Sequence, residues 1–302
     1  MRIIFMGTPD FAVPSLDILI QNGYNIVGVI TATDKRGGRG NKKILESGVK
    51  KYAKEKGLNI LQPPNLKAPE FVEELRALKA DLQIVVAFRM LPRVVWDMPP
   101  MGTFNLHGSL LPKFRGAAPI NWAIMRNEAE TGLTTFFLKQ KIDTGNMLFQ
   151  AKLPIGENET AGELHDRMMI LGADLTLKTI RAIENNDYTT KVQDESLVSH
   201  ASKIFHNTCQ VDFDQSTLTV HNFIRGLSPY PTAWTMLNDK KLKLFRTLKE
   251  IVEHDHEAGS FHSNNKNSIK IATKDGYVQI LELQLQGRKR MKVKDFLNGF
   301  KF

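Results

Sequence analysis

The sequence predicts two domains: an α/β domain built on a mostly parallel sheet, followed by a smaller antiparallel β domain. In the first part of the chain, short apolar and β-branched runs alternate with stretches in which apolar residues recur at helical spacing. Toward the end of the chain, short alternating segments follow one another with only turns between them. The chain has 302 residues, 42% of them hydrophobic, which is enough to bury a sizeable core.

Short apolar runs predict the strands of the first domain. They occupy residues 2–6, 25–31, 59–61, 82–87 and 102–107. Between them, residues such as Phe71, Leu75 and Leu78 are spaced as on one face of a helix. Strands that alternate with helices are joined by crossover connections, so we expect parallel strands with helices on both faces of the sheet.

Two further apolar runs predict a hairpin that extends this sheet. They are residues 134–139 and 147–154, and a short polar turn separates them. A helix should then close the first domain, because apolar residues recur at helical spacing after the hairpin. These residues are Leu164, Met168, Leu171 and Leu175.

The polar residues 184–203 follow neither the helical nor the strand period and predict a linker. We therefore place the first domain at residues 1–187, the linker at 188–206 and the second domain at 207–302. Short alternating segments between Asn-, Asp- and Gly-containing turns indicate that the second domain is an antiparallel sheet, of the kind that forms small barrels. These segments are residues 241–245, 268–273 and 277–284.

The net charge of +9 is concentrated late in the chain. Residues 200–302 hold 16 Lys and Arg against 10 Asp and Glu, whereas residues 1–199 hold 25 against 22. A polyanionic partner and a lysine-rich solvated surface explain this excess equally well. The single cysteine, Cys209, excludes an internal disulfide and fits a buried apolar position in a reducing compartment. No window approaches the roughly 18 apolar residues that cross a bilayer, so we expect a soluble cytoplasmic protein with no membrane partner.

Polar side chains gather where the strand at 102–107 ends. Asn105 and His107 lie two residues apart, so their side chains share one face of the strand. Ligands of parallel sheets bind at the carboxyl ends of strands. Asp143 lies in the turn of the predicted hairpin. If that hairpin pairs beside this strand, the carboxylate can reach the imidazole.

An amide, an imidazole and a carboxylate in one place suit acyl transfer to an amine. When a neutral amine attacks a carbonyl, negative charge builds on oxygen and positive charge on nitrogen. Asn105 can donate to the oxyanion, and His107, protonated beside Asp143, can donate more strongly. Asp143 can also anchor a water that carries off the proton. The amine is itself the nucleophile, and Ser109 lacks the glycine-flanked elbow of a catalytic serine.

These motifs resemble the formyltransferases that use 10-formyltetrahydrofolate. Residues 104–123 and 131–148 contain the Asn–x–His, Ser–Leu–Leu–Pro and Asp–Thr–Gly motifs of their active-site core. Residues 3–16, 38–43 and 225–234 match the branch of that family whose acceptor is initiator methionyl-tRNA, and the resemblance covers nearly the whole chain. It implies a Rossmann-like first domain and an OB-like β-barrel that grips the tRNA acceptor arm. It also implies formyl transfer to the α-amino group of the methionine.

The resemblance assigns a role to each candidate site residue. Asn105, His107 and Asp143 match the catalytic trio. The residues that match the folate site are Ser109, Leu110, Leu111 and Pro112, with the backbone of Ala87, Phe88 and Met90 framing the pterin. The residues expected to contact tRNA are Phe11, Lys35, Arg36, Arg39, Lys42, Lys43 and Lys203. For Phe11, ordinary packing explains the residue equally well.

The chain departs from the family pattern at three places. Arg89 stands where a glycine is common, Asn146 replaces an aspartate of the catalytic loop, and His206 with Asn207 replaces a Lys–Glu pair of the linker. We expect no metal, because a facial triad needs two histidines and this trio has one.

We expect a monomeric enzyme, and two alternatives remain. One is a formyltransferase for an amino sugar nucleotide or another small amine, such as a purine precursor. The other is a non-catalytic RNA-binding protein, which would not need the complete trio. The nearby His254, His256 and His262 favour a solvated turn over a zinc site, since no cysteine accompanies them.

Overall fold

The computed structural model describes residues 1–38, 40 and 43–301, which fall into two compact units. Unit 1 contains Met1–Arg115, Gly132–Lys152 and Asp166–Ser199. Unit 2 contains Gly116–Thr131, Leu153–His165 and the chain from His200 onward. Each unit is therefore assembled from stretches that are far apart in the sequence.

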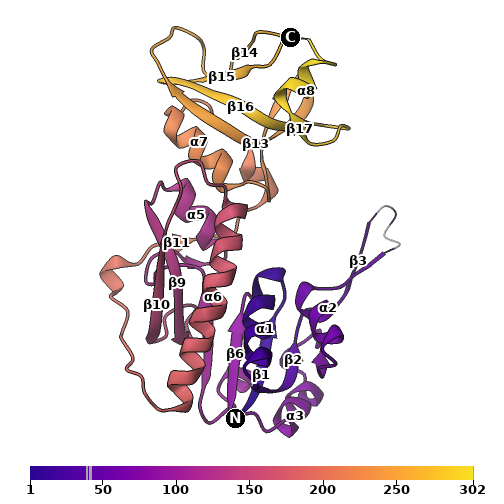
Figure 1. Ribbon diagram of the computed structural model, residues 1–302, viewed down its shortest axis with the longest axis vertical. Coiled ribbons are helices and arrows are strands. Elements are labelled where there is room, and N and C mark those ends of the chain that lie inside the picture. Colours follow the sequence, from indigo (N-terminus) through magenta and orange to yellow (C-terminus); the bar gives the residue numbers. More distant parts are fainter. Residues whose placement is uncertain (39, 41–42, 302) are drawn as a thin grey trace. The chain divides into compact units, whose positions relative to one another are not determined.

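Unit 1 is built on a seven-stranded sheet with the order β10-β9-β7-β6-β1-β2-β5 (Figure 1). The five strands from β7 to β5 are parallel, and β9 pairs antiparallel with β7. The prediction of a parallel sheet extended by an added hairpin is confirmed. The strands are β1 (Arg2–Gly7), β2 (Asn25–Ile30), β5 (Ile60–Leu61), β6 (Leu82–Val86), β7 (Thr103–His107), β9 (Glu130–Phe137) and β10 (Met147–Pro154).

The central strands of this sheet are buried on both faces. All five residues of β6 are buried, and so are the last five of β1. A strand covered on both faces gains from apolar side chains at every position, so its sequence is a continuous apolar run without alternation. This is why the runs at residues 2–6 and 82–87 identified the strands correctly.

Helices of unit 1 follow the predicted spacing. In α3, Phe71, Val72 and Leu75 are buried, and Pro69 stands in the first turn, where its missing N–H costs nothing. The last helix, α6, packs closely on β7, because a Cβ at Gly172 would lie 2.8 Å from a methyl carbon of Leu106. The helical elements are η1 (Asp10–Ala12), α1 (Val13–Gln21), α2 (Gly48–Glu55), α3 (Pro69–Ala77), α4 (Arg93–Trp96), α6 (Ala161–Glu184) and η3 (Glu195–Leu197). Helix α6 belongs to unit 1 from Asp166 onward.

A small hairpin stands out from unit 1 (Figure 1). It is formed by β3 (Lys35–Gly37) and β4 (Lys43–Leu45), with Arg36 opposite Ile44. Its strands pair only with each other. The basic segment was predicted to be a loop. Its two ends instead pair with each other and form a two-stranded ribbon.

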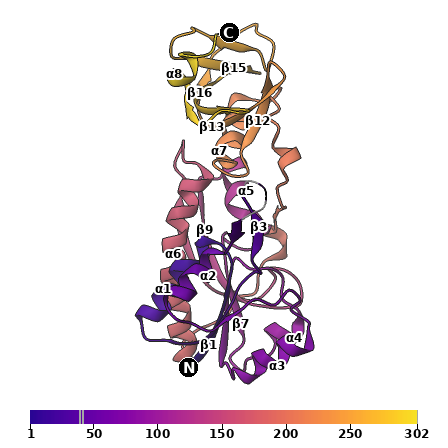
Figure 2. The same cartoon turned by 90° about the vertical axis from the view of Figure 1, so that its right-hand side faces the viewer.

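Unit 2 is an antiparallel sheet with the order β12-β13-β16-β15-β14, with β17 also paired to β16 (Figure 2). The predicted antiparallel domain is confirmed. Register shifts near Arg246 place bulges in β13, and bulges bend a long strand. The strands are β12 (Ala233–Leu237), β13 (Lys240–Ile251), β14 (Phe261–Ser263), β15 (Ile269–Thr273), β16 (Gly276–Leu285) and β17 (Met291–Lys292).

Helix α7 fills one side of the core of unit 2. Val220 and Ile224 are buried in the same apolar cluster as Leu244, Ile271 and Cys209. Cys209 is thus a buried apolar residue, as its sequence context indicated. The helices of unit 2 are α5 (Pro119–Met125), α7 (Thr217–Gly226), α8 (Val293–Leu297) and η4 (His206–Cys209), and two short strands are β8 (Arg115–Gly116) and β11 (His200–Ala201).

Within the described residues, no helix combines the length and the apolar composition that a membrane span requires.

The core of unit 2 contains a histidine that burial keeps neutral. His221 on α7 is 1% exposed, and its Nδ1 lies 2.9 Å from the hydroxyl of Thr247. Burial, together with the charges of Arg225 and Lys249, lowers the pKa of His221 to about 4. In an unfolded chain the pKa of histidine is near 6.5. The unfolded state therefore binds a proton first as the pH falls.

Stability should consequently decrease as the pH falls from 6.5 toward 4, because protonation of His221 in the unfolded state lowers the free energy of unfolding by roughly 3 kcal/mol over this window. The variant His221→Gln does not titrate, so its stability should fall less over this window. Urea unfolding at several pH values measures the difference, with the exposed His200→Gln as the matched control. Equal pH dependence in wild type and His221→Gln would contradict the prediction.

Candidate active site

The expected trio comes together at the end of β7. His107 is the last residue of that strand and is 6% exposed, and Asn105 is half-buried two residues earlier. Asp143 lies in the loop between β9 and β10. Its carboxylate oxygen Oδ2 is 3.9 Å from Nδ1 of His107. The imidazole and the carboxylate are therefore neighbours, as the hairpin arrangement predicts.

Strand pairing explains how Asp143 reaches this position. In the register of β7 and β9, Phe137 at the end of β9 lies opposite Phe104, whereas His107 lies opposite Thr134. The loop after β9 thus starts at the opposite end of β7 from His107. It has to return along β7 by about 10 Å, at 3.3 Å per residue, before Asp143 can meet the imidazole.

One ring nitrogen of His107 already forms a hydrogen bond within the protein. Its Nε2 lies 3.0 Å from the carbonyl oxygen of Phe114. A carbonyl can only accept, so Nε2 carries hydrogen and donates. Nδ1 is the nitrogen that faces Asp143, and 3.9 Å is longer than a hydrogen bond. Nδ1 is therefore the ring atom left for a substrate.

The loop of Ser109 to Pro112 is held by its own protein neighbours. The hydroxyl of Ser109 donates to the carbonyl of Lys113 at 2.6 Å, which agrees with the absence of a nucleophile elbow. The side chains of Ser109, Leu111 and Pro112 are buried, and Leu110 is half-buried. Leu110 is thus the apolar member of this loop with the largest surface available to a ligand ring.

Two polar residues of the β9–β10 hairpin hold this loop in place. Thr134 on β9 donates to the carbonyl of Ser109 at 2.7 Å and accepts from the N–H of Leu111 at 3.0 Å. Gln150 on β10 donates to the carbonyl of Leu111 at 2.9 Å. Sequence reasoning did not identify these two residues. Each lies in a strand that contains other polar residues, such as Thr135 and Lys152, so no local pattern marks it.

The segment after β6 lies beside the trio. Val86 pairs with Leu106, so Ala87 follows next to His107, and its backbone has a positive φ of 48°. Phe88 is half-buried and Met90 is exposed. Arg89, the departure from the family pattern, donates to the carbonyls of Pro63 and Pro64 and thereby ties this segment to the residues after β5.

Asn146, the second departure, closes the loop that carries Asp143. Its backbone carbonyl accepts from the N–H of Phe137 at 3.1 Å, and its side-chain oxygen accepts from Nζ of Lys139 at 2.8 Å. Gly145 sits so close to the turn that a Cβ would lie 1.6 Å from the carbonyl oxygen of Phe137. Glycine is therefore required at this position.

The expected tRNA-contact residues lie in both units. Lys35, Arg36 and Lys43 are exposed on the β3–β4 hairpin of unit 1, whereas Arg39 and Lys42 lie outside the described residues. Asp34, the acid of this segment, pairs with Lys50 at 2.5 Å. Hydrogen bonds from Gln62 and Lys50 lower the pKa of Asp34, so it stays ionised.

The other two expected contacts differ in exposure. Phe11 in η1 of unit 1 is largely buried. Lys203 of unit 2 is exposed, and its Nζ lies 5.3 Å from the ring centre of Phe205. His206, the third departure, stacks on Trp234 with ring centres 6.1 Å apart. An imidazole stacked on an indole thus stands where the resemblance led us to expect a Lys–Glu pair.

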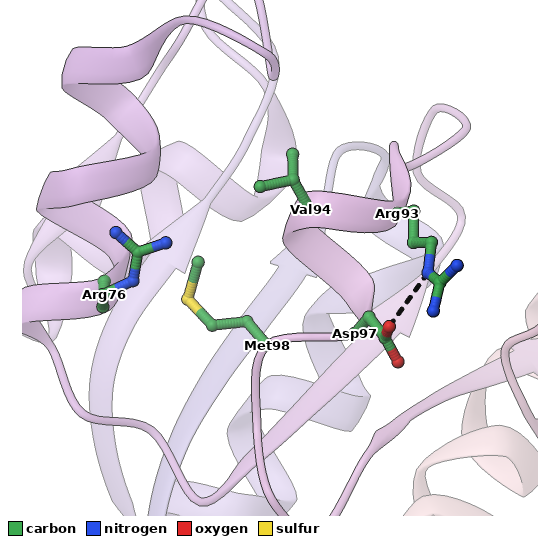
Figure 3. A pocket seen from close by; sticks show the side chains of 5 residues that line it. All are labelled: Arg76, Arg93, Val94, Asp97 and Met98. Carbon is green, nitrogen blue, oxygen red and sulfur yellow. Dashed lines mark hydrogen bonds and ion pairs between the residues drawn. The ribbon is translucent and has the colours of Figure 1, made fainter.

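Two other clusters of polar side chains lie outside the trio. The first is an open hollow between α3 and α4 that holds the arginines Arg76 and Arg93 (Figure 3). Arg93 pairs with Asp97 at 3.0 Å and Arg76 pairs with Glu73, so both charges are compensated. The hollow is lined by Arg76, Arg93, Val94, Asp97 and Met98, none of which belongs to the trio.

The second cluster is the group of histidines in unit 2. The rings of His256 and His262 lie 4.0 Å apart, and His254 packs on Tyr277 at 4.4 Å. Over the part of the chain that the structure describes, no three His, Cys, Asp or Glu residues are placed to hold a metal ion.

Comparison with known proteins places the chain in a family. Residues 1–180 match the model of the formyl transferase family, and residues 203–301 match that of the formyl transferase C-terminal domain. Methionyl-tRNA formyltransferase of Flavobacterium johnsoniae is 52% identical over 307 residues, covering 100% of this chain and 97% of the relative. Its counterpart in Parabacteroides distasonis is 50% identical over 311 residues, with 100% and 96% covered.

Solved structures share the fold at low sequence identity. An N-formyltransferase of Helicobacter canadensis, solved with folinic acid and dTDP-3-aminofucose, superposes with a TM-score of 0.71 at 23% identity and covers 96% of this chain and 100% of its own. HypX of Aquifex aeolicus, solved with tetrahydrofolic acid, has a TM-score of 0.65 at 18% identity, with 98% and 47% covered. Since both family models match and full-length relatives share half of its residues, the chain belongs to the formyl transferase family.

Proposed function

We propose that the chain is a methionyl-tRNA formyltransferase, which transfers the formyl group of 10-formyltetrahydrofolate to the α-amino group of methionine on initiator tRNA. The observation that carries this proposal is the His107–Asp143 pair at the end of β7, with Asn105 beside it. The pair occurs in a chain that is half identical, end to end, to proteins named for this activity.

The reaction requires one bond to form and one to break. The amine nitrogen attacks the formyl carbon, and the bond from that carbon to N10 of the folate then breaks. The amine loses a proton and N10 gains one. Negative charge builds on the formyl oxygen in the intermediate, so donors aimed at that oxygen accelerate the step. The half-buried amide of Asn105 supplies one such donor.

His107 supplies a second donor, and the structure restricts how. Its Nε2 already donates to the carbonyl of Phe114, so only Nδ1 can donate to the formyl oxygen. A ring with hydrogen on both nitrogens is an imidazolium. The carboxylate of Asp143 lies 3.9 Å from Nδ1, which is beyond hydrogen-bond distance, so the carboxylate does not occupy this nitrogen.

Asp143 acts on the amine as well as on the imidazole. A carboxylate at the rim of the site can hold a water that takes the proton from the attacking nitrogen. The side chain of Asp143 is only partly buried, which allows a water to approach it. The same carboxylate therefore assists at both charged atoms of the intermediate. It lies beside the His107 ring that donates to the formyl oxygen, and it holds the water that takes the proton from the amine nitrogen.

The folate is a substrate of this reaction, and the residues beside the trio suit it. The backbone of Ala87, Phe88 and Met90 can frame the pterin, because Ala87 lies next to His107 and turns the chain with a positive φ. The loop of Ser109 to Pro112 offers the half-buried Leu110 to an aromatic ring. Thr134 and Gln150 hold that loop in place before the ligand binds.

The charge distribution supports a tRNA acceptor. Exposed cations line the β3–β4 hairpin of unit 1, and residues 200–302 hold 16 Lys and Arg against 10 Asp and Glu. Cations that neutralise phosphates release counterions from the RNA and so contribute to affinity. Lys203 is exposed and can take part in the same way.

A direct test offers several acceptors side by side. The labelled formyl donor is incubated with the protein and methionyl initiator tRNA, an amino sugar nucleotide or glycinamide ribonucleotide. Label on methionyl-tRNA supports the proposal, whereas label on another acceptor, or on none, rejects it.

Replacing Asn105 or His107 by alanine should lower formyl transfer by about a hundredfold or more, because each removes a donor to the oxyanion. Binding of tRNA should persist, since neither residue belongs to the basic hairpin. Single-turnover kinetics and a filter-binding assay measure the two effects. The exposed His200→Ala serves as control. Turnover close to normal in either site variant would reject the assignment.

Replacing Lys35 and Arg36 together by alanine should weaken tRNA binding and make it less sensitive to salt. The slope of log affinity against log salt should decrease by roughly one for each phosphate that the variant no longer neutralises. The control is the double variant Lys51→Ala, Lys67→Ala, which removes the same charge from exposed positions outside the hairpin. Titrations at several salt concentrations provide the slopes. If both double variants change the slope equally, net charge rather than the hairpin is responsible.

A further inference from the structure

The residues from Lys191 to Ser199, which include the short helix η3, form a segment of unit 1 here called the strap. Lys191 bridges to Met147 through two backbone hydrogen bonds of 2.8 and 2.9 Å, directly after the loop that carries Asp143. At its other end, Ser199 accepts the N–H of Arg115 at 2.9 Å. The strap therefore extends from the loop of Asp143 to the segment that hydrogen-bonds His107.

Gln193 is the residue of the strap that contacts the catalytic loop. It is 5% exposed, and its Nε2 donates to the carbonyl oxygens of Asp143 at 2.8 Å and Gly145 at 2.9 Å. Its Oε1 accepts from Arg115, whose Nε is 3.0 Å and Nη2 2.7 Å away. Because arginine can only donate, the amide has one possible orientation, with both N–H groups toward the loop.

Arg115 is itself fixed. It is 7% exposed, and its guanidinium also bonds the carboxylate of Glu195 at 2.8 and 3.1 Å. The guanidinium thus lies between two side chains of the strap, and every side-chain hydrogen-bonding group of Gln193 has a partner. A buried polar network in which each member is satisfied holds its geometry rigidly.

The strap also holds the partner of the histidine. Ser199 Oγ accepts from the N–H of Phe114 at 2.9 Å, and the carbonyl of Phe114 accepts from Nε2 of His107 at 3.0 Å. One nine-residue segment is therefore connected by hydrogen bonds to both members of the His107–Asp143 pair.

The loop needs such support. It returns along β7 by about 10 Å, and Asp143 has a φ of 53°, in the left-handed region that residues with a side chain rarely adopt. A conformation of this kind persists only where the surrounding structure imposes it. The two bonds from Gln193 act on the carbonyls of Asp143 and Gly145, on either side of Thr144.

We propose that Gln193, oriented by Arg115, is a positioning residue that sets the location of the Asp143 carboxylate relative to His107. This inference rests on the proposed function, because it assigns a role within the same site. Gln193 contacts the backbone of Asp143 and acts on the reaction through it. Loss of its two donors should let the loop move, and a displacement near 1 Å can reduce a rate about a hundredfold.

The test compares Gln193→Leu with the wild type. We expect kcat to fall by about 10- to 100-fold while KM for the folate and for methionyl-tRNA stays within about twofold. Gln193→Glu keeps the size of the side chain and its contact with Arg115 but carries no donor, and it should show the same loss. It replaces Gln193→Leu if that variant does not fold. The matched control, Val192→Ala, changes an exposed neighbouring side chain of the strap, leaves the network of Gln193 and Arg115 in place and should keep a normal kcat.

A double-mutant cycle separates positioning from general stability. In an Asp143→Ala background, Gln193→Leu should cause no further loss of kcat, because its effect passes through Asp143. Loss of the same size in both backgrounds, or a normal kcat in Gln193→Leu and Gln193→Glu alike, overturns the proposal.

A measurement without substrate keeps this inference distinct from the proposed function. Amide hydrogen exchange of residues 139–146 should become faster in Gln193→Leu and stay unchanged in Val192→Ala. Unchanged exchange in Gln193→Leu overturns the positioning role. If wild type fails to formylate methionyl-tRNA, the proposed function is rejected, and hydrogen exchange still decides whether Gln193 holds the loop.

Discussion

The antiparallel pairing of β9 with β7 is the contact on which the candidate active site depends. β7 ends the series of parallel strands, and β9 covers its open edge with His107 opposite Thr134. This pairing brings the loop of Asp143 onto the strand that carries Asn105 and His107. It also places the start of that loop at the end of β7 that is farther from His107. The loop therefore has to return along β7 before the carboxylate and the imidazole can meet.

The site is built from loops whose positions are set by side chains of neighbouring segments. Thr134 and Gln150 bond the backbone of the loop at Ser109 to Pro112, and Gln193 bonds that of the Asp143 loop. Most of these bonds run from a side chain to a backbone group. They allow an irregular backbone to stay in place without regular secondary structure. A site whose donors are already placed does not have to reorganise when charge develops, which is the main source of electrostatic catalysis.

Much of the fold and the centre of the site were predictable from local patterns. Continuous apolar runs identified the parallel strands, because strands buried on both faces have no polar side. The two-residue period of a strand placed Asn105 and His107 on one face. Helix α7 was not predicted. Its first turn is Thr217-Leu218-Thr219, and its start is stabilised by Asp275, which accepts from the N–H of Thr217 at 2.6 Å. That partner lies 58 residues later. The start of the helix also has a local signal that sequence reasoning did not use, the N-cap Ser216, whose Oγ accepts from the N–H of Thr219 at 3.2 Å.

By itself, the sequence determined which segments form the parallel strands of unit 1, the change from a parallel to an antiparallel sheet, and the residue types available for acyl transfer. Each of these depends on periodicity or composition within a short window. Only the tertiary structure decided that residues 116–131 and 153–165 join unit 2 and that Gln193, in a stretch without any period, contacts the loop of Asp143. Gln193 lies 50 residues from Asp143 and 78 from Arg115. Hydrogen bonds between such distant residues are formed by the folded chain and leave no repeating pattern along it.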